Sequence, residues 1–327
     1  MASLSSSKQG NASQLISVVV PAYNEAAVLE ESHNRLSAAI DGMAYDFEII
    51  YVNDGSSDDT AGIIHGLRSR DPRVGLVNLS RNFGKEVALT AGLEHASGDA
   101  VVVIDADLQD PPELIPELVA RWQEGFDVVY ATRNKRLGEN WLKKSTAALF
   151  YRLMQKISRI RLPRDTGDFR ILSRRAVDAV TRLREQHRFM KGLFTWIGFK
   201  QTSISYDRDP RHGGESKWSY WQLWNFALEG ITSFSVAPLK ISTYLGILTA
   251  VGAFVYGAII ITKTLIFGAD LPGYPSLMVV ILFLGGIQLI SIGIIGEYLG
   301  RTFNESKNRP LYFVDEYLPS NRQTTAD

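Results

Sequence analysis

Apolar runs alternate with segments of helical spacing along the first two thirds of the chain. The strand-like runs lie at residues 16–24, 47–54, 74–79, 100–104 and 127–131. Apolar positions at helical spacing follow them, at residues 25–40, 60–67, 85–95 and 113–123. Strands that alternate with helices in this way predict βαβ units and a mostly parallel sheet. We therefore expect a doubly wound, Rossmann-like α/β fold.

The segments before and after these alternating elements show other patterns. Residues 1–15 are rich in Ser, Gln and Asn and hold no apolar run, so we expect a disordered N-terminus without a secretory signal. Residues 164–170 are polar and predict a loop that runs into a short strand. The remaining pattern predicts helices at 174–183 and 189–196 and an edge strand at 202–206.

Two nearly uncharged runs, 241–261 and 277–295, dominate the segment 239–300. A helix needs about 20 apolar residues to cross a bilayer, so both runs predict transmembrane helices. Residues 218–236 precede them with Trp218, Trp221 and Trp224, and indole rings favour the membrane interface. Residues 141–162 have the spacing of a basic amphipathic helix, which suits an anionic membrane surface.

The basic residues around these spans predict their orientation. Lys240 precedes the first span and Arg301, Lys307 and Arg309 follow the second, whereas the connection between them carries Lys263 alone. The positive-inside rule then puts the α/β domain and both termini in the cytoplasm of a multi-pass plasma (inner) membrane protein. In the tail, 301–327, a strand-like run at 310–318 suggests a hypothesis, in which it adds a strand to another subunit's sheet.

Composition excludes several classes of site. The chain has no cysteine, which removes disulfides, thiolate metal sites and cysteine nucleophiles. Its net charge of zero gives no global field for nucleic acid, and we expect no nucleic-acid partner. Neither a Gly-x-Gly-x-x-Gly after the first strand nor a P-loop occurs, so a bound phosphate must be held by metal and basic side chains.

Candidate binding residues lie at the point where each of the predicted strands ends. They are Pro21, Tyr23, Glu25, Asn53, Asp54, Arg81, Asp105, Asp107 and Arg133. Singly, each is an ordinary cap or turn residue. Because parallel strands end at the same edge of a sheet, however, these side chains are expected to converge on one cleft.

The Asp105-Ala-Asp107-Leu-Gln109 stretch offers two carboxylates and an amide oxygen just past a buried strand. These are hard ligands that suit Mg²⁺ or Mn²⁺, although an isolated Asp-x-Asp is more often a solvated turn. A second candidate is the glycine-rich loop 208–217, whose Arg211 and Lys217 are able to pair with a diphosphate. Without a ligand, that loop is simply a connection between domains.

The chain resembles glycosyltransferase family 2, and within it the polyisoprenyl-phosphate glycosyltransferases: dolichol-phosphate mannose synthase and bactoprenol glucosyltransferases. The matching stretches occur in order at 20–25, 52–58, 80–85, 105–113, 166–170 and 211–217. The resemblance implies a GT-A catalytic domain at 16–217 and inverting, metal-dependent transfer of one sugar from a nucleotide sugar to a lipid phosphate. It also allows a homo-oligomer, with a tetramer among the options.

Carried over by position, the resemblance gives each candidate a role. Pro21, Tyr23, Glu25 and Asp54 should hold the nucleoside. Asp105, Asp107 and Gln109 should hold the divalent metal on the diphosphate, with Arg133, Arg211 and Lys217 as phosphate partners. Asp168 and Arg170 should face the acceptor. An acceptor phosphate needs no general base, since its second pKa is about 6. A hydroxyl acceptor would need one, and Asp168 is then the candidate.

Several alternatives stay open. UDP-glucose and undecaprenyl phosphate are the first choice of substrates, and GDP-mannose or UDP-linked amino-arabinose would serve the same chemistry. A processive polysaccharide synthase is a second reading, but the chain has no Gln-x-x-Arg-Trp motif and too few spans for a channel. A non-catalytic nucleotide-binding scaffold is a third, and the retained Asp105 and Asp107 argue against it.

Overall fold

The computed structural model describes residues 14–133, 166–206, 235–268 and 273–321, and the statements below concern these residues. They divide into two compact units. One contains residues 14–133, 166–206 and 310–321, and the other contains 235–268 and 273–309. The predicted helix at 141–162, the loop 208–217 and most of the Trp-rich segment 218–236 lie outside the described residues, as do residues 1–13.

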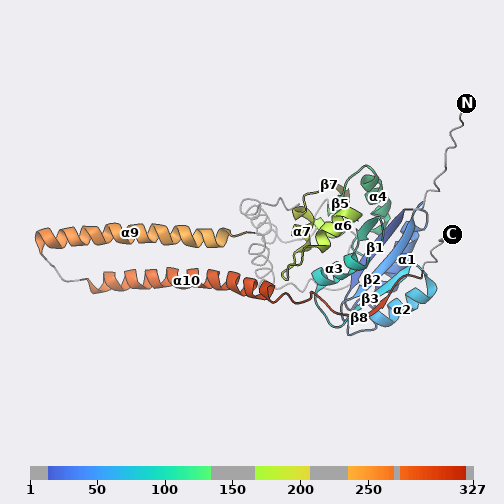
Figure 1. Ribbon diagram of the computed structural model, residues 1–327, viewed down its shortest axis with the longest axis horizontal. Coiled ribbons are helices and arrows are strands. Elements are labelled where there is room, and N and C mark those ends of the chain that lie inside the picture. The colour runs from blue at the N-terminus through green and yellow to red at the C-terminus, as the bar shows by residue number, and fades with distance from the viewer. Residues whose placement is uncertain (1–13, 134–165, 207–234, 269–272, 322–327) are drawn as a thin grey trace, which may run out of the picture. The chain divides into compact units, whose positions relative to one another are not determined.

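The first unit is built on an eight-stranded sheet with the order β7-β5-β6-β4-β1-β2-β3-β8 (Figure 1). Its strands are β1 (Leu15–Ala22), β2 (Asp46–Asn53), β3 (Val74–Leu79), β4 (Ala100–Val103), β5 (Val128–Arg133), β6 (Thr166–Ser173), β7 (Gln201–Tyr206) and β8 (Val314–Leu318). The β1–β2, β2–β3, β1–β4 and β5–β7 pairs are parallel, whereas β6 and β8 pair antiparallel with their neighbours. The predicted mostly parallel α/β sheet is therefore confirmed.

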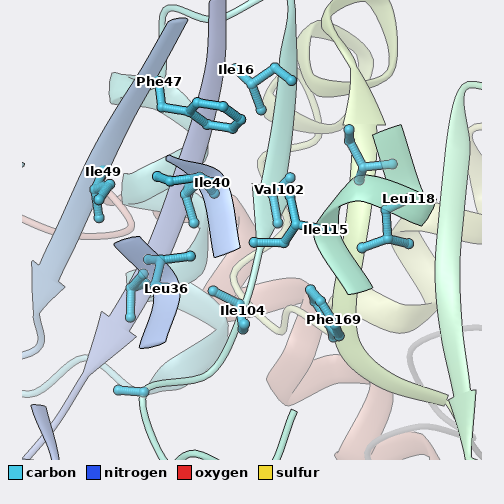
Figure 2. Packing of buried hydrophobic residues seen from close by; sticks show 14 of the residues in the cluster. Ile16, Leu36, Ile40, Phe47, Ile49, Val102, Ile104, Ile115, Leu118 and Phe169 are labelled. Atoms are coloured by element: carbon cyan, nitrogen blue, oxygen red, sulfur yellow. The ribbon is translucent and has the colours of Figure 1, made fainter. Parts of the chain in front are cut away.

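Helices follow the strands along the chain. They are α1 (Leu29–Ile40), α2 (Thr60–Arg70), α3 (Lys85–His95), the 3₁₀ turn η1 (Pro112–Leu114), α4 (Ile115–Gln123), α6 (Arg174–Thr181) and α7 (Met190–Trp196). Residues 16–22 of β1 are all buried, as expected of a central strand that is covered on both faces. One face of the sheet packs against α1 and α4 through a cluster that includes Ile16, Leu36 and Ile115 (Figure 2).

The opposite face of the sheet packs closely against α3. A Cβ atom at Gly92 would lie 2.2 Å from Val19 Cγ1 and 3.0 Å from Val52 Cγ2, inside van der Waals contact. Glycine at this position lets the helix backbone approach β1 and β2 directly. This close packing fixes the height of α3 over the sheet, and with it the position of the first residue of α3, Lys85.

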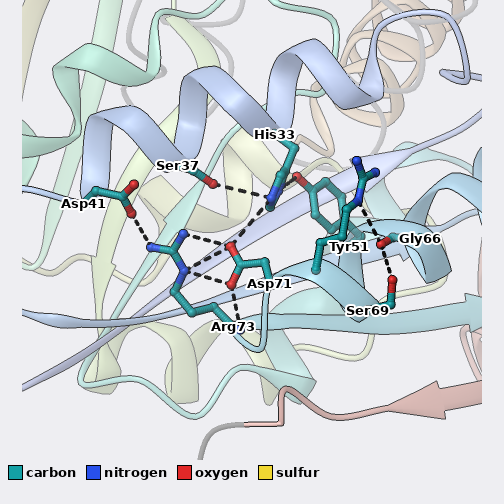
Figure 3. A network of polar contacts seen from close by, with 9 residues as sticks. His33, Ser37, Asp41, Tyr51, Gly66, Ser69, Asp71 and Arg73 are labelled. Carbon is teal, nitrogen blue, oxygen red and sulfur yellow. Dashed lines mark hydrogen bonds and ion pairs between the residues drawn. The ribbon is translucent and has the colours of Figure 1, made fainter.

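A polar network ties α1 to the loop before β3 (Figure 3). Arg73 donates from Nη2 to Asp71 Oδ2 over 2.8 Å and from Nη1 to Asp41 Oδ1 over 2.7 Å. His33 Nε2 lies 3.6 Å from Asp71 Oδ2, and His33 Nδ1 lies 3.1 Å from the hydroxyl of Tyr51. Burial lowers the pKa of His33, so the neutral ring is the form that this network favours.

Two segments differ from the sequence-based expectation. Of the stretch predicted as a polar loop, residues 166–170 belong to β6, whose eight residues are all buried between β4 and β5. The tail does form a strand, but β8 pairs with β3 of its own chain, with Leu76 opposite Leu318. The hypothesis that the tail adds to another subunit's sheet is therefore wrong for this structure. The charged and polar residues of β6 gave it the pattern of a loop. For β8, the spacing of apolar residues predicts a strand but carries no information about the strand with which it pairs.

The second unit contains two long helices, α9 (Ala237–Phe267) and α10 (Tyr274–Ser306), with 31 and 33 residues. Mean hydropathy reaches 2.1 in α9 and 2.6 in α10, and none of either apolar window is buried. The helices lie side by side, with a 2.7 Å hydrogen bond between the hydroxyls of Ser242 and Ser291 (Figure 1). Both are long and apolar enough to cross a membrane, as the sequence predicts.

Candidate functional site

Six of the nine predicted strand-end residues gather around one cavity of about 320 Å³ in the first unit, whereas Asn53, Arg81 and Arg133 are not part of its lining. Among the residues that line this strand-end cavity are Pro21, Tyr23, Glu25, Asp54, Asp105 and Asp107. They lie at or just past the ends of β1, β2 and β4, which are parallel neighbours and end at the same edge of the sheet. The expected convergence at the carboxyl ends of the strands is thus present in the structure.

Backbone strain marks two loops at the strand-end cavity. Leu108, next to Asp107, has φ of 60° and is buried, and Asn24, next to Tyr23, has φ of 55°. Positive φ is unfavourable for a side chain such as leucine, and it persists where the surroundings fix the backbone. Here Asp107 Oδ1 accepts the N–H of Gln109 over 3.2 Å, and Asn24 Oδ1 accepts the N–H of Ser57 over 2.8 Å.

Lys85 is a cavity residue that the sequence analysis did not select. Its Nζ lies 2.7 Å from Asp105 Oδ1 and 2.6 Å from Asp168 Oδ2, so one ammonium bridges two carboxylates. Desolvation works against the charge of Lys85, but Asp105 and Asp168 outweigh it and raise the Lys85 pKa. Its sequence signal was its place as the first residue of the helix after the third strand.

The bridge also sets the charge state of Asp168. Burial alone would raise the pKa of Asp168, but Lys85, and then Lys191 and Arg170, bring it below its usual range. Asp168 therefore stays ionised. Continuing the β4–β6 register from the Val103–Arg170 pair sets Asp168 opposite Asp105, which explains how both reach Lys85.

Arg170 does not lie on the surface of the site. It is 3% exposed, and its Nε and Nη2 donate to the carbonyl oxygens of Asp168 and Gly167 over 3.0 and 2.8 Å. Its guanidinium carbon also lies 4.1 Å from the ring centroid of Phe194. The expectation that Arg170 faces an acceptor thus differs from this placement, in which Arg170 supports the backbone that carries Asp168.

Asp54 is buried, and both of its carboxylate oxygens accept backbone hydrogen bonds. Oδ1 accepts the N–H of Phe83 over 2.7 Å, and Oδ2 accepts the N–H of Gly84 over 2.9 Å. Burial raises the pKa of Asp54, although these two hydrogen bonds oppose the shift. Asp54 therefore lines the strand-end cavity and also holds the loop that leads into Lys85.

Two further carboxyl groups near the bridge favour protonation. Burial, followed by the charges of Asp107 and Asp105, raises the pKa of Glu25 to about 7. Burial, followed by the charge of Asp168, raises the pKa of Glu86 to about 7 as well. Glu86 Oε2 accepts the N–H of Met190 over 2.9 Å and so connects α3 with α7. Both shifts thus arise in part from the neighbouring acidic residues, Asp105, Asp107 and Asp168.

The candidate donor set for a divalent cation lies only partly in the lining of the strand-end cavity. Asp105 and Asp107 line the strand-end cavity, whereas Gln109 is 2% exposed and is not part of its lining. Within the described residues, Gln109 Oε1 is buried without a hydrogen-bond partner, which leaves an oxygen available as a ligand. No cluster of three or more His, Asp or Glu side chains there is arranged to hold a metal. The residues thus suit a cation that takes its other ligands from a diphosphate.

The remaining candidates are the three basic residues expected to pair with phosphate, Arg133, Arg211 and Lys217. Arg133 ends β5, which is parallel to β7 and, through β6, runs in the direction of β4. Its backbone therefore lies at the same edge of the sheet as the strand-end cavity. Arg211 and Lys217 lie outside the described residues.

Family models match both parts of the chain. Residues 17–181 match the model described as glycosyl transferase family 2. Residues 237–302 match the model described as the GtrB C-terminal hairpin, which spans α9 and most of α10.

Curated relatives match along nearly the whole chain. An uncharacterized glycosyltransferase of Synechocystis sp. is 53% identical over 93% of this chain and 97% of its own. The prophage bactoprenol glucosyl transferase homolog of Escherichia coli is 48% identical over 91% of this chain and 98% of its own. The bactoprenol glucosyl transferase of Shigella phage SfV is 49% identical over 91% and 97%.

Among solved structures, glucosyl-3-phosphoglycerate synthase from Mycobacterium tuberculosis, in complex with Mn²⁺, UDP-glucose and phosphoglyceric acid, is 26% identical. The match covers 67% of this chain and 78% of that chain, with a TM-score of 0.45.

Proposed function

The chain belongs to glycosyl transferase family 2 and is a glycosyltransferase, and on that premise we propose that it transfers glucose from UDP-glucose to a polyisoprenyl phosphate. Relatives at 48% and 49% identity that are named for bactoprenol glucosyl transfer support this choice of sugar and lipid. Undecaprenyl phosphate is the proposed acceptor. GDP-mannose and UDP-linked amino-arabinose remain the competing donors.

One observation carries the proposal: paired carboxylates, Asp105 and Asp107, share a cavity with Tyr23 and with the Lys85 ammonium. Tyr23 is 46% exposed there, and its ring is available to pack against a base. In this proposal Pro21, Glu25 and Asp54 complete the nucleoside site. Arg133, Arg211 and Lys217 pair with the phosphates.

Asp105, Asp107 and Gln109 are the residues proposed to hold Mg²⁺ or Mn²⁺. When bound, such a cation neutralises the charge that develops on the leaving nucleoside diphosphate. The protein itself orients the donor, and Asp54 keeps the Lys85 loop in place through the N–H groups of Phe83 and Gly84. The acceptor oxygen attacks the anomeric carbon as the bond to the diphosphate breaks, which inverts the configuration.

The charge state of Asp168 favours a phosphate acceptor over a hydroxyl acceptor. A general base works best with a pKa near the working pH, and Lys85 keeps the pKa of Asp168 well below that. A lipid phosphate arrives mostly ionised near pH 7 and needs no proton removed. Asp168 then serves to hold Lys85 rather than to take a proton.

The two apolar helices fit a lipid substrate, because they would keep the enzyme in the bilayer that holds its acceptor. We propose a multi-pass plasma-membrane protein with the catalytic domain and both termini on the cytoplasmic side. The basic residues that flank the spans support this orientation. Labelling of single cysteines introduced at residues 8 and 270, in intact cells and in opened membranes, tests it.

The deciding experiment uses the full chain in detergent with undecaprenyl phosphate, Mg²⁺ and one radiolabelled donor at a time. We expect labelled lipid from UDP-glucose and little from GDP-mannose or UDP-linked amino-arabinose. Label in the lipid from a different donor alone would reassign the sugar. Nucleotide binding without transfer from any donor would favour the scaffold reading instead.

A further inference from the structure

Lys85 provides the positive charge in a cavity that is otherwise acidic. Among the described residues that line the strand-end cavity, it is the sole cation, and it shares the lining with Glu25, Asp54, Asp105 and Asp107. Its side chain is 47% exposed, and its ammonium is held by ion pairs with Asp105 and Asp168. An ammonium in that setting is able to exchange partners.

The two partners of Lys85 differ in what else they are available to bind. Asp105 lines the cavity beside Asp107, as a carboxylate for a divalent cation must. Asp168 lies on β6 and is not part of the cavity lining. A divalent cation on Asp105 would meet an ammonium 2.7 Å from the same carboxylate, and like charges at such distances repel strongly. A move of the ammonium fully onto Asp168 relieves this conflict.

We propose that Lys85 is an exchangeable counter-ion: it competes with the divalent cation for Asp105 and is retained by Asp168 when that cation binds. The inference rests on the metal assignment of the proposed function. In the metal-bound state, Lys85 on Asp168 presents its charge to the anionic acceptor. Without it, the acceptor phosphate would approach an Asp168 carboxylate that has lost the ammonium paired with it over 2.6 Å.

The site therefore uses one lysine for two purposes. Before the metal arrives, Lys85 pairs with the carboxyl groups of Asp105 and Asp168 together. After it arrives, the metal compensates Asp105 and the lysine compensates Asp168. The divalent cation adds two positive charges near the reacting groups. They are added at the stage when two anionic substrates must be brought together.

The test is titration of Mn²⁺ into the full chain in detergent with saturating UDP, with bound Mn²⁺ counted by electron paramagnetic resonance. Lys85→Gln should bind Mn²⁺ about tenfold more tightly than the wild type, within the 5–150-fold range of typical site couplings. Lys85→Arg retains the charge and should stay within about twofold of wild type. Lys200→Gln removes a lysine that stacks on Phe126 instead, and should leave the affinity unchanged.

The outcomes separate this inference from the proposed function. Equal or weaker Mn²⁺ binding by Lys85→Gln, with binding lost in Asp105→Ala, overturns the role of Lys85 alone. No Mn²⁺ binding by the wild type beyond that of free UDP overturns the metal assignment and the inference with it. A purely structural ion pair would lower the melting temperature of Lys85→Gln without tightening Mn²⁺ binding, and that result also overturns the inference.

A second readout concerns the acceptor. The KM of Lys85→Gln for undecaprenyl phosphate should rise about tenfold, whereas its KM for the nucleotide sugar should change little. An unchanged KM for the lipid phosphate overturns the acceptor-side part of the inference.

Discussion

Gly84 donates its backbone N–H to Asp54 Oδ2 over 2.9 Å, which fixes the loop before α3 to the end of β2. The same carboxylate accepts the N–H of Phe83, so its two oxygens set the direction in which α3 begins. Lys85 follows at once and reaches both Asp105 and Asp168. A residue selected for nucleoside binding thus also positions the charge at the centre of the site.

Asp54→Asn should impair transfer and lower stability together. Asparagine offers one acceptor oxygen and turns an N–H₂ group towards a backbone donor, so a buried N–H loses its partner at a cost of about 1–3 kcal/mol. A displaced Lys85 loop should reduce turnover by roughly 10–100-fold. Steady-state kinetics and thermal melting measure the two effects. Asp59→Asn, at an exposed acid nearby in sequence, is the control and should change neither.

Asp105→Ala and Asp107→Ala should each reduce transfer by at least roughly 100–1,000-fold, because each removes a carboxylate proposed to hold the cation. Both variants should still fold and enter the membrane. Glucolipid formation in washed membranes measures the loss, and Asp178→Ala provides an exposed acidic control. Wild-type turnover of either variant, in the presence of metal, contradicts the assignment.

Gly92→Ala should destabilise the first unit by about 1–3 kcal/mol, the usual cost of overpacking. The new Cβ would lie 2.2 Å from Val19 Cγ1, so either α3 or β1 must shift. Thermal melting of the full chain measures this. Gly42→Ala, where a Cβ meets nothing within 4 Å, is the matched control. Equal melting temperatures for the two variants would show that α3 tolerates the shift.

The stability of the first unit should fall below pH 6.5, in part through His33. Burial lowers the folded-state pKa of His33 below its ordinary value of 6.5, so the unfolded chain binds the proton more readily. The contribution of neutral His33 is fully present above pH 6.5 and is lost as the pH falls through the folded-state pKa. Melting curves from pH 8 to pH 5 should therefore drop more steeply for the wild type than for His33→Gln. Parallel curves contradict this role.

Removal of residues 310–327 should destabilise the first unit and cause aggregation, because it exposes the β3 edge to which β8 is paired. It also removes the 2.6 Å hydrogen bond from the Tyr312 hydroxyl to Glu94. Melting and light scattering measure these effects. Removal of residues 322–327 alone retains β8 and should behave as the wild type. A stable, monodisperse chain that lacks β8 would contradict the structural role of the strand.

The sequence predicted most of the sheet because its central strands are continuous apolar runs that alternate with helical spacing. It also predicted the strand-end cavity, since Glu25, Asp54 and Asp105 each follow such a run. It failed where the partner of a residue comes from a distant segment. Lys85 acquires its role from Asp168, which is opposite Asp105 only because β6 enters the sheet in an antiparallel direction.

The same limit applies to Arg170 and β8. Motif position implied that Arg170 faces the acceptor, but its side chain folds back onto the carbonyl groups of its own strand, which the local sequence does not reveal. The tail has the composition of a strand, and its pairing with β3 depends on contacts across most of the chain. Local sequence patterns predict helices and strands, whereas the contacts of Arg170 and the pairing of β8 depend on the complete fold.

The pairing of β8 with β3 has a consequence for biosynthesis. Ser80 donates its N–H to the carbonyl of Phe313 over 3.0 Å, and both apolar helices lie between these residues in the sequence. The ribosome must therefore finish α9 and α10 before the last strand exists. The edge of the nascent sheet stays open while the most aggregation-prone part of the polypeptide emerges. We expect membrane integration to proceed during translation, with closure of the sheet as the final, post-translational step.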